Sequence, residues 1–229
     1  MAGLRIESVS PGSIADQLEV AAGDRLLAVN GLPLRDLIDY SYYTASEEEL
    51  LLEIEKPDGE LWELEVERQA GEPLGLTFSA PAPARCANNC LFCFVHQLPK
   101  GLRKPLYVKD EDYRLSFLNG NYVTLANIKT PALHRIIEQR LSPLYISVHA
   151  TNPDLRARLL GKSGIPDILE QLQRLAAARI VMHTQVVLCP GLNDGDELQR
   201  TVTELAALYP AVQSLAVLNR SKRALAFSV

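Results

Sequence analysis

From Leu74 to the end of the chain, segments that favour strands alternate with segments that favour helices. Short apolar runs predict strands at residues 75–79, 114–118, 144–148, 180–188 and 213–218, and apolar residues at helical spacing predict helices at residues 131–140, 154–160, 166–178 and 196–208. Such alternation indicates a parallel sheet whose strands are joined by right-handed helical crossovers. The expected fold class of this part is therefore α/β.

Residues 1–70 follow a different pattern, in which short strands are separated by tight turns. Apolar and acidic residues alternate on both sides of Pro57-Asp58-Gly59, which predicts a hairpin of residues 50–55 and 61–68. The remaining elements expected here are a strand at 5–9, a short helix at 14–20 and a strand between the turn dipeptides Gly23-Asp24 and Asn30-Gly31. The N-terminal part is therefore expected to be a small, mainly-β domain.

The composition limits the classes of function. Lys and Arg total 23 and Asp and Glu total 28, so the formal net charge is −5. This balance lacks the bulk positive charge that holds duplex nucleic acid. No apolar run approaches the roughly 18 residues of a membrane span, and residues 1–6 lack the apolar run of a signal peptide. We expect a cytoplasmic protein, with neither a membrane nor a nucleic acid as partner.

Three of the four cysteines, Cys86, Cys90 and Cys93, lie within eight residues at the spacing Cys-x3-Cys-x2-Cys. In a reducing compartment, clustered thiols indicate metal ligands rather than disulfides, and thiolates suit iron–sulfur clusters or zinc. A structural zinc site takes four protein ligands, whereas three cysteines on a 4Fe–4S cluster leave one iron free for a substrate or cofactor. Zinc with His96 as its fourth ligand stays open as the alternative.

Two stretches of the N-terminal part carry a resemblance to a known module. Ser10 to Ala15 and Ala22 to Gly31 resemble the core of bacterial PDZ domains, which bind C-terminal peptides by adding a strand to a sheet edge. The loop that captures the peptide carboxylate normally precedes this core, where only five residues stand here. Residues 73–78 could supply it in permuted order, or could form the first strand of the next domain. A scaffold that docks on its own catalytic domain is the other hypothesis.

The cysteine spacing, placed after a strand at the start of a parallel α/β domain, resembles the radical SAM superfamily. The resemblance implies a partial parallel (β/α) barrel of radical SAM type and two cofactors, a 4Fe–4S cluster and S-adenosyl-L-methionine. Cys86, Cys90 and Cys93 would ligate the cluster. One electron from the reduced cluster would then cleave S-adenosylmethionine to a 5′-deoxyadenosyl radical that abstracts hydrogen from a substrate.

The same resemblance implies positions that contact S-adenosylmethionine. The triplet at residues 119–121 is expected after the second strand, where the family carries a glycine-rich turn, although a plain turn also explains it. His149 is interpreted as a pocket or core residue and Cys189 as a small strand-end residue. The candidate cofactor-binding residues are Phe92, Asn119, Gly120, Asn121, Ser147 and Gln185.

The stretch from Cys90 to Leu125 is similar to a bacterial family of PDZ-containing radical SAM iron–sulfur proteins with a further C-terminal domain of unknown function. Lys100, Arg103, Lys104 and Lys109 form a basic group beside the cysteines. A solvated face explains this group, but an anionic substrate or a reductant such as flavodoxin or ferredoxin could dock there. A C-terminal peptide at the PDZ-like domain is the other expected partner.

These observations predict a PDZ-like domain at residues 1–70 and a radical SAM partial barrel at residues 74–229. Five strands are expected where the superfamily's partial barrel has six, and residues 218–229 depart from the family pattern. We therefore expect a chain truncated at its C-terminus, as by a frameshift. The expected function is radical SAM chemistry on an unknown substrate. The alternatives are a PDZ adaptor with a structural zinc loop and an inactive truncated paralogue.

Overall fold

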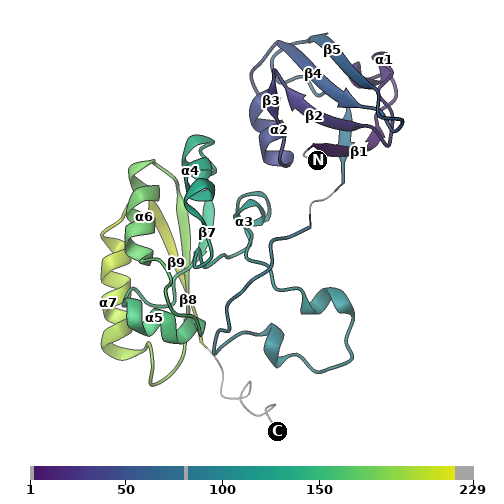
Figure 1. Cartoon of the computed structure of the whole chain (residues 1–229). Coiled ribbons are helices and arrows are strands. Elements are labelled where there is room, and N and C mark those ends of the chain that lie inside the picture. Colours follow the sequence, from purple (N-terminus) through teal and green to yellow (C-terminus); the bar gives the residue numbers. More distant parts are fainter. Residues whose placement is uncertain (1–2, 80–81, 220–229) are drawn as a thin grey trace. The chain divides into compact units, whose positions relative to one another are not determined.

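The computed structural model describes residues 3–79 and 82–219. The chain divides into two compact units, residues 1–82 and residues 83–229 (Figure 1). The boundary therefore lies near residue 82, later than the gap between residues 70 and 74 that the sequence suggests. The divergent tail expected at residues 218–229 lies, from residue 220 on, outside the described residues.

The first unit is one antiparallel sheet with two short helices. Its strands run in the order β5-β4-β2-β1-β6, and β3 pairs with β2. The elements are β1 (Leu4–Val9), α1 (Ile14–Gln17), β2 (Arg25–Val29), β3 (Leu32–Pro33), α2 (Leu37–Thr44), β4 (Glu49–Glu55), β5 (Leu61–Glu67) and β6 (Leu76–Phe78). These elements confirm the small, mainly-β N-terminal domain.

The β4–β5 hairpin shows how the alternating sequence sets the register. Leu50, Leu52 and Ile54 turn inward and are buried, because successive side chains of a strand point to opposite faces. The opposite face carries glutamates that stand directly across from one another, as in the pairs Glu49–Glu67 and Glu53–Glu63. The turn closes where Glu60 N donates to the Asp58 carboxylate at 3.1 Å.

Strand β6 belongs to this first sheet. It pairs antiparallel with β1, with Phe78 opposite Ile6 and Leu76 opposite Val9. Two hypotheses were open for residues 73–78. The structure agrees with the one that places them in the PDZ-like unit, in permuted order. The expectation that residues 75–79 open the parallel sheet is wrong, because this pairing is long-range and leaves no local signal.

The second unit contains a parallel sheet in the order β7-β8-β9. The isolated parallel bridge between Val123 and Ile146 extends it on the β7 side. The elements are η1 (Val95–Gln97), η2 (Lys104–Tyr107), α3 (Tyr113–Asn119), α4 (Thr130–Glu138), β7 (Leu144–Ser147), α5 (Pro153–Leu160), α6 (Ile168–Ala177), β8 (Met182–Leu188), α7 (Gly195–Ala206) and β9 (Val212–Asn219). The described residues confirm an α/β fold with a parallel sheet, but they do not form a full barrel.

The strand expected at residues 114–118 is instead helix α3. The Asp112 carboxylate caps its first turn by accepting from Arg114 N at 3.0 Å. Gly120 ends the helix in the left-handed conformation, with a φ of 75°. Ser116 then ties the helix to β7, since its Oγ donates to Tyr145 O at 3.1 Å. The position next to β7 in the sheet is taken by Val123, through its bridge to Ile146.

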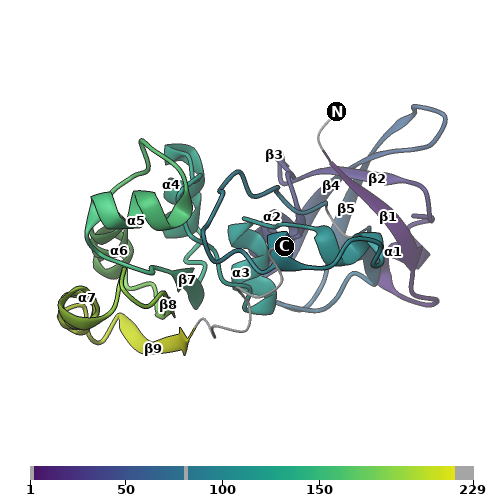
Figure 2. The same cartoon turned by 90° about the horizontal axis from the view of Figure 1, so that it is seen from below.

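The two faces of the parallel sheet differ. Helices α5, α6 and α7 lie on one side of it in both views (Figures 1 and 2). Met182, Thr184 and Val186 of β8 turn to this side and are fully buried. His183 and Gln185 alternate with them and therefore face the other side, where they remain partly accessible. The second face carries the polar residues available for a site.

Candidate cofactor site at the cysteine loop

The loop that carries the three cysteines is anchored at both ends by main-chain hydrogen bonds. Cys86 N donates to Lys109 O at 2.9 Å beside an antiparallel bridge between Arg85 and Asp110. Further along, Asn89 N and Leu91 N donate to Leu160 O and Leu159 O, both at 3.0 Å. These two carbonyls end α5 and have no partner within the helix. The loop amides thus satisfy the last carbonyls of the helix, and the same hydrogen bonds hold the loop in position.

The two ends of helix α5 are set by capping residues, and its C-terminal end lies against the loop. Asn152 caps its start, with a side-chain oxygen that accepts from Asp154 N at 3.1 Å. Gly161 ends it with a φ of 59°. A Cβ atom at Gly161 would lie 2.2 Å from Asn89 O. Because real side chains do not tolerate such a contact, only glycine fits beneath the loop.

Asn88 fixes the loop from inside and is 2% exposed. Its Nδ2 donates to Thr124 Oγ1 at 2.9 Å, and its Oδ1 accepts from Asn127 Nδ2 at 3.1 Å. Its main-chain oxygen accepts from Lys109 Nζ at 2.7 Å. Lys109, which the sequence groups with a basic docking surface, is thus engaged inside the loop.

The loop lies at the carboxyl ends of the parallel strands. Phe92 packs its ring 4.4 Å from the ring of His149, which follows β7. The same side chain contacts a small buried cluster of Ala150, Leu159 and Cys189, the last of which follows β8. Sites in open parallel sheets form at this edge, outside the carboxyl ends of the strands. The position of the loop agrees with this rule, and Phe92 packs the loop in place.

All four cysteines are free thiols, and the three in the loop are only partly buried. Burial, together with the neighbouring Cys86 and Cys93, raises the pKa of Cys90 to about 12. Burial also raises the pKa of Cys86, against a main-chain hydrogen bond from Asn88. The three sulfurs are therefore close enough to influence one another, and the raised pKa values of Cys86 and Cys90 favour their neutral thiols.

Within residues 3–79 and 82–219, no group of three or more His, Cys, Asp and Glu side chains is arranged to hold a metal ion. The zinc alternative needs His96 as its fourth ligand, and the Nε2 atom of this residue lies 3.0 Å from Lys109 Nζ. A 4Fe–4S cluster takes each thiolate on a different iron, so its three sulfurs stand wider apart than the ligands of one ion. Three free, partly buried thiols on one anchored loop therefore fit the cluster by their donor chemistry.

The other candidate residues lie in two places. Ser147 and Gln185 are register partners on β7 and β8, and Gln185 Nε2 lies 3.4 Å from Ser147 Oγ. Asn119 is the last residue of helix α3, and Gly120 and Asn121 follow it, so the premise that the triplet follows a strand is wrong. The Asn121 side chain donates to Asp110 at 2.8 Å. Cofactor contact by these residues stays a prediction.

Two charged residues at this site, the buried Arg156 and the partly buried Glu111, were not predicted from the sequence. Arg156 of α5 is fully buried, and its Nε and Nη2 donate to Val148 O at 3.1 Å and Thr124 O at 2.5 Å. Glu111 accepts from the Thr124 hydroxyl at 2.8 Å and from its amide at 2.7 Å. Burial raises the pKa of Glu111, and it outweighs these hydrogen bonds, which lower the pKa. A possible signal was the spacing of Arg156 with Leu159 and Leu160, which puts all three on one helix face.

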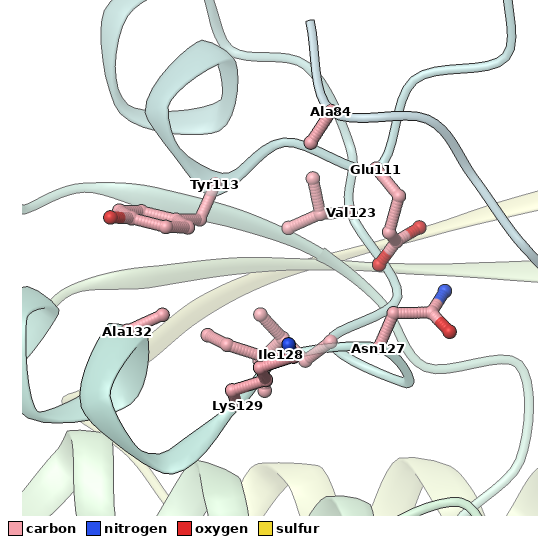
Figure 3. Close-up of a pocket in the computed structure, with 9 residues that line it drawn as sticks. Ala84, Glu111, Tyr113, Val123, Asn127, Ile128, Lys129 and Ala132 are labelled. Carbon is pink, nitrogen blue, oxygen red and sulfur yellow. The ribbon is translucent and has the colours of Figure 1, made fainter. Parts of the chain in front are cut away.

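Glu111 also borders a cavity of about 220 Å³. Figure 3 shows its carboxylate and the Asn127 amide at one side, with Tyr113 and Ala132 at the other. Most of the remaining lining residues are apolar, among them Val123, Leu125 and Ile128. The cavity thus combines an apolar wall with one acidic group. It also borders Asn127, whose side chain donates to Asn88.

Two family models match the chain. The model of a Radical SAM-like domain matches residues 68–215, which is more than half of the chain. The chain belongs to the Radical SAM-like domain family. The model of a PDZ domain matches residues 5–56 of this Radical SAM-like protein. Both matches confirm the resemblances drawn from the sequence. No curated protein matches the chain, and no helix among the described residues is long and apolar enough to cross a membrane.

Replacement of Gly161 tests whether the end of α5 holds the loop. We expect Gly161→Ala to detach Asn89 and Leu91, so that their amides exchange with deuterium at least about tenfold faster, equivalent to about 1.4 kcal/mol. Gly164→Ala is the matched control, because Gly164 also has a positive φ but no atom within 4 Å of its Cβ position. Equal exchange of residues 86–93 in both variants, measured by mass spectrometry, would contradict this assignment.

The buried His149 predicts a pH dependence of stability. Burial, with a smaller contribution from Arg156, lowers its pKa to about 3. The unfolded chain, with a histidine pKa of about 6.5, binds a proton first as the pH falls. Stability is thus fully present above about pH 6.5 and is lost toward pH 3, by up to about 1.4 kcal/mol per pH unit.

We expect His149→Asn to lessen this loss, because asparagine tolerates the φ of 67° at this position. The measurement is urea unfolding of the reduced, metal-free chain, followed by far-ultraviolet circular dichroism between pH 7 and 4.5. His134→Asn, on the exposed side of α4, should retain the wild-type slope. A slope that His149→Asn leaves unchanged would show that another group carries the effect.

Proposed function

We propose that this protein is a radical SAM iron–sulfur enzyme. The observation that supports the proposal most strongly is a Cys-x3-Cys-x2-Cys loop, anchored on α5, at the carboxyl edge of a parallel sheet. Cys86, Cys90 and Cys93 would hold a 4Fe–4S cluster whose fourth iron is free for S-adenosylmethionine. When bound, these cofactors supply one-electron cleavage of the sulfonium to methionine and a 5′-deoxyadenosyl radical for hydrogen abstraction.

The chain's own residues would hold and shield these cofactors. The Asn88 hydrogen bonds and the α5 carbonyls fix the loop, which limits the motion of the thiols before a cluster binds. Phe92 closes the loop against His149 and excludes water from that side. The buried Ser147 and the partly accessible Gln185, adjacent on β7 and β8, are the proposed polar contacts of S-adenosylmethionine. A flavodoxin- or ferredoxin-type reductant would supply the electron.

Anaerobic reconstitution tests the proposal. We expect about four irons per chain in the wild type, and 5′-deoxyadenosine after addition of dithionite and S-adenosylmethionine. Cys90→Ala should lose both, since a cluster ligand is removed. Cys189→Ala is the matched control, because Cys189 is a buried cysteine outside the loop, and it should retain both. Stoichiometric zinc without a cluster would support the structural-staple alternative instead.

A second candidate function is capture of a C-terminal peptide by the first unit, and the position of β6 favours it. This strand ends the sheet and follows Gly75, whose φ is 83°. Leu74 O accepts from Ala15 N at 3.0 Å, and Gly75 O accepts from Ser10 N at 2.8 Å. The turn before β6 is therefore fixed on the start of α1. A fixed turn before an edge strand is the arrangement by which PDZ domains add a peptide strand.

Fluorescent hexapeptides of varied sequence test this candidate. We expect a subset to bind with a free C-terminal carboxylate and to lose binding when amidated, measured by fluorescence polarisation. Gly75→Ala should weaken binding, because its Cβ would lie 2.2 Å from Ser13 Cβ. Gly12→Ala is the control, with a positive φ but open space around it. The fluorescence of Trp62, the single tryptophan, reports whether the unit stays folded. Binding that is indifferent to amidation would contradict the candidate.

A further inference from the structure

The most unusual buried group of the second unit is the guanidinium of Arg156. It is 0% exposed, and two of its nitrogens donate to main-chain carbonyls, Val148 O and Thr124 O. Within the part of the chain that the structure describes, the third nitrogen, Nη1, is buried without a hydrogen-bond partner. Burial of an unpaired N–H costs free energy, on the order of 1–3 kcal/mol. Such a group indicates a partner other than the described protein atoms.

The position of Arg156 places its charge beneath the cysteine loop. Arg156, Leu159 and Leu160 share the buried face of α5, and the carbonyls of the last two hold Leu91 N and Asn89 N. Val148 follows β7 and Thr124 follows the Val123 bridge, so the guanidinium joins the carboxyl ends of two adjacent strands. Cys90 is also near enough to contribute to the electrostatic environment of Arg156. The guanidinium therefore lies at these strand ends, on the helix whose last carbonyls hold the loop.

The charge of Arg156 is only indirectly balanced by the protein. Its two acceptors are neutral carbonyls, and no carboxylate of the described residues lies within salt-bridge distance. Glu111 is connected to it through Thr124, whose carbonyl accepts from Arg156 and whose hydroxyl donates to Glu111. His149 is neutral at physiological pH, because burial lowers its pKa to about 3. A buried cation in this setting stabilises a nearby anion strongly, since little water screens it.

We propose that Arg156 is the internal counter-ion of the cysteine-bound cluster and raises its reduction potential. The inference rests on the proposed function, since it concerns the cluster that Cys86, Cys90 and Cys93 would hold. Reduction transfers one electron from the external donor to the cluster, with no bond made or broken, and adds one negative charge. A fixed positive charge favours the reduced state more than the oxidised state, as net charge and hydrogen bonds to sulfur do in iron–sulfur proteins generally. Arg156 is thus a positioning residue that acts through the cluster and keeps its own proton.

Redox titration of the reconstituted chain, followed by the paramagnetic signal of the reduced cluster, tests this role. At the wild-type midpoint potential, we expect Arg156→Gln to lower the ratio of reduced to oxidised cluster about tenfold, or about 59 mV for one electron. Arg158→Gln is the matched control, because Arg158 lies two residues along the same helix but is exposed. It should keep the wild-type midpoint. A fully loaded Arg156→Gln protein with an unchanged midpoint would overturn the inference.

Arg156→Gln could fail to fold or to load a cluster, and Glu111→Gln then decides the question. Glu111 carries the negative charge nearest to Arg156 along the hydrogen bonds, so its removal should shift the midpoint in the opposite direction, toward easier reduction. The titration is run at about pH 8, well above the ordinary carboxyl pKa. An unchanged midpoint in Glu111→Gln would then overturn the inference. If the wild type itself binds no cluster, the proposed function fails; a loaded wild type with insensitive variants overturns this inference alone.

Discussion

The last two carbonyls of α5 are the contacts on which the candidate site depends. A helix leaves its final carbonyl groups without partners, and in this chain Leu159 and Leu160 offer theirs to the cysteine loop. Because the loop and the helix end share these hydrogen bonds, neither can move without exposing polar groups of the other. The absence of a Cβ at Gly161 then permits the close approach of Asn89. The position of three thiols thus follows from where one helix stops.

A second set of hydrogen bonds joins this helix end to the sheet. Arg156 connects α5 to the carboxyl ends of two strands, and Thr124 connects that junction to Asn88 inside the loop. Each broken hydrogen bond in a buried polar network would leave a desolvated group, so these contacts resist opening. The loop is consequently held by the sheet as well as by the helix. Its geometry does not depend on a bound metal for these contacts.

Local patterns in the sequence were sufficient for the parallel strands at residues 144–148, 180–188 and 213–218 and for the PDZ-like unit. They were insufficient at residues 114–118, where a short apolar run suits either a strand or a helix. Asp112 and Gly120, at the two ends, decide for the helix. The pairing of β6 with β1 joins residues about 70 positions apart, which no local pattern encodes. The spacing of the cysteines was enough to predict a cluster site. The burial of Arg156 was not predicted, since charged residues on helices usually face water.

The sheet of the first unit has two unlike borders. Strand β5 forms one border and carries outward glutamates at residues 63, 65 and 67, of which Glu63 and Glu67 stand across from glutamates of β4. Exposed strand edges invite pairing with other chains, and charge on an edge discourages it. Strand β6, at the other border, consists of Leu76, Thr77 and Phe78 and carries no charge. Charge repulsion therefore protects the β5 edge from pairing with other chains. Both unwanted aggregation and recognition of a partner strand would then begin at the β6 edge.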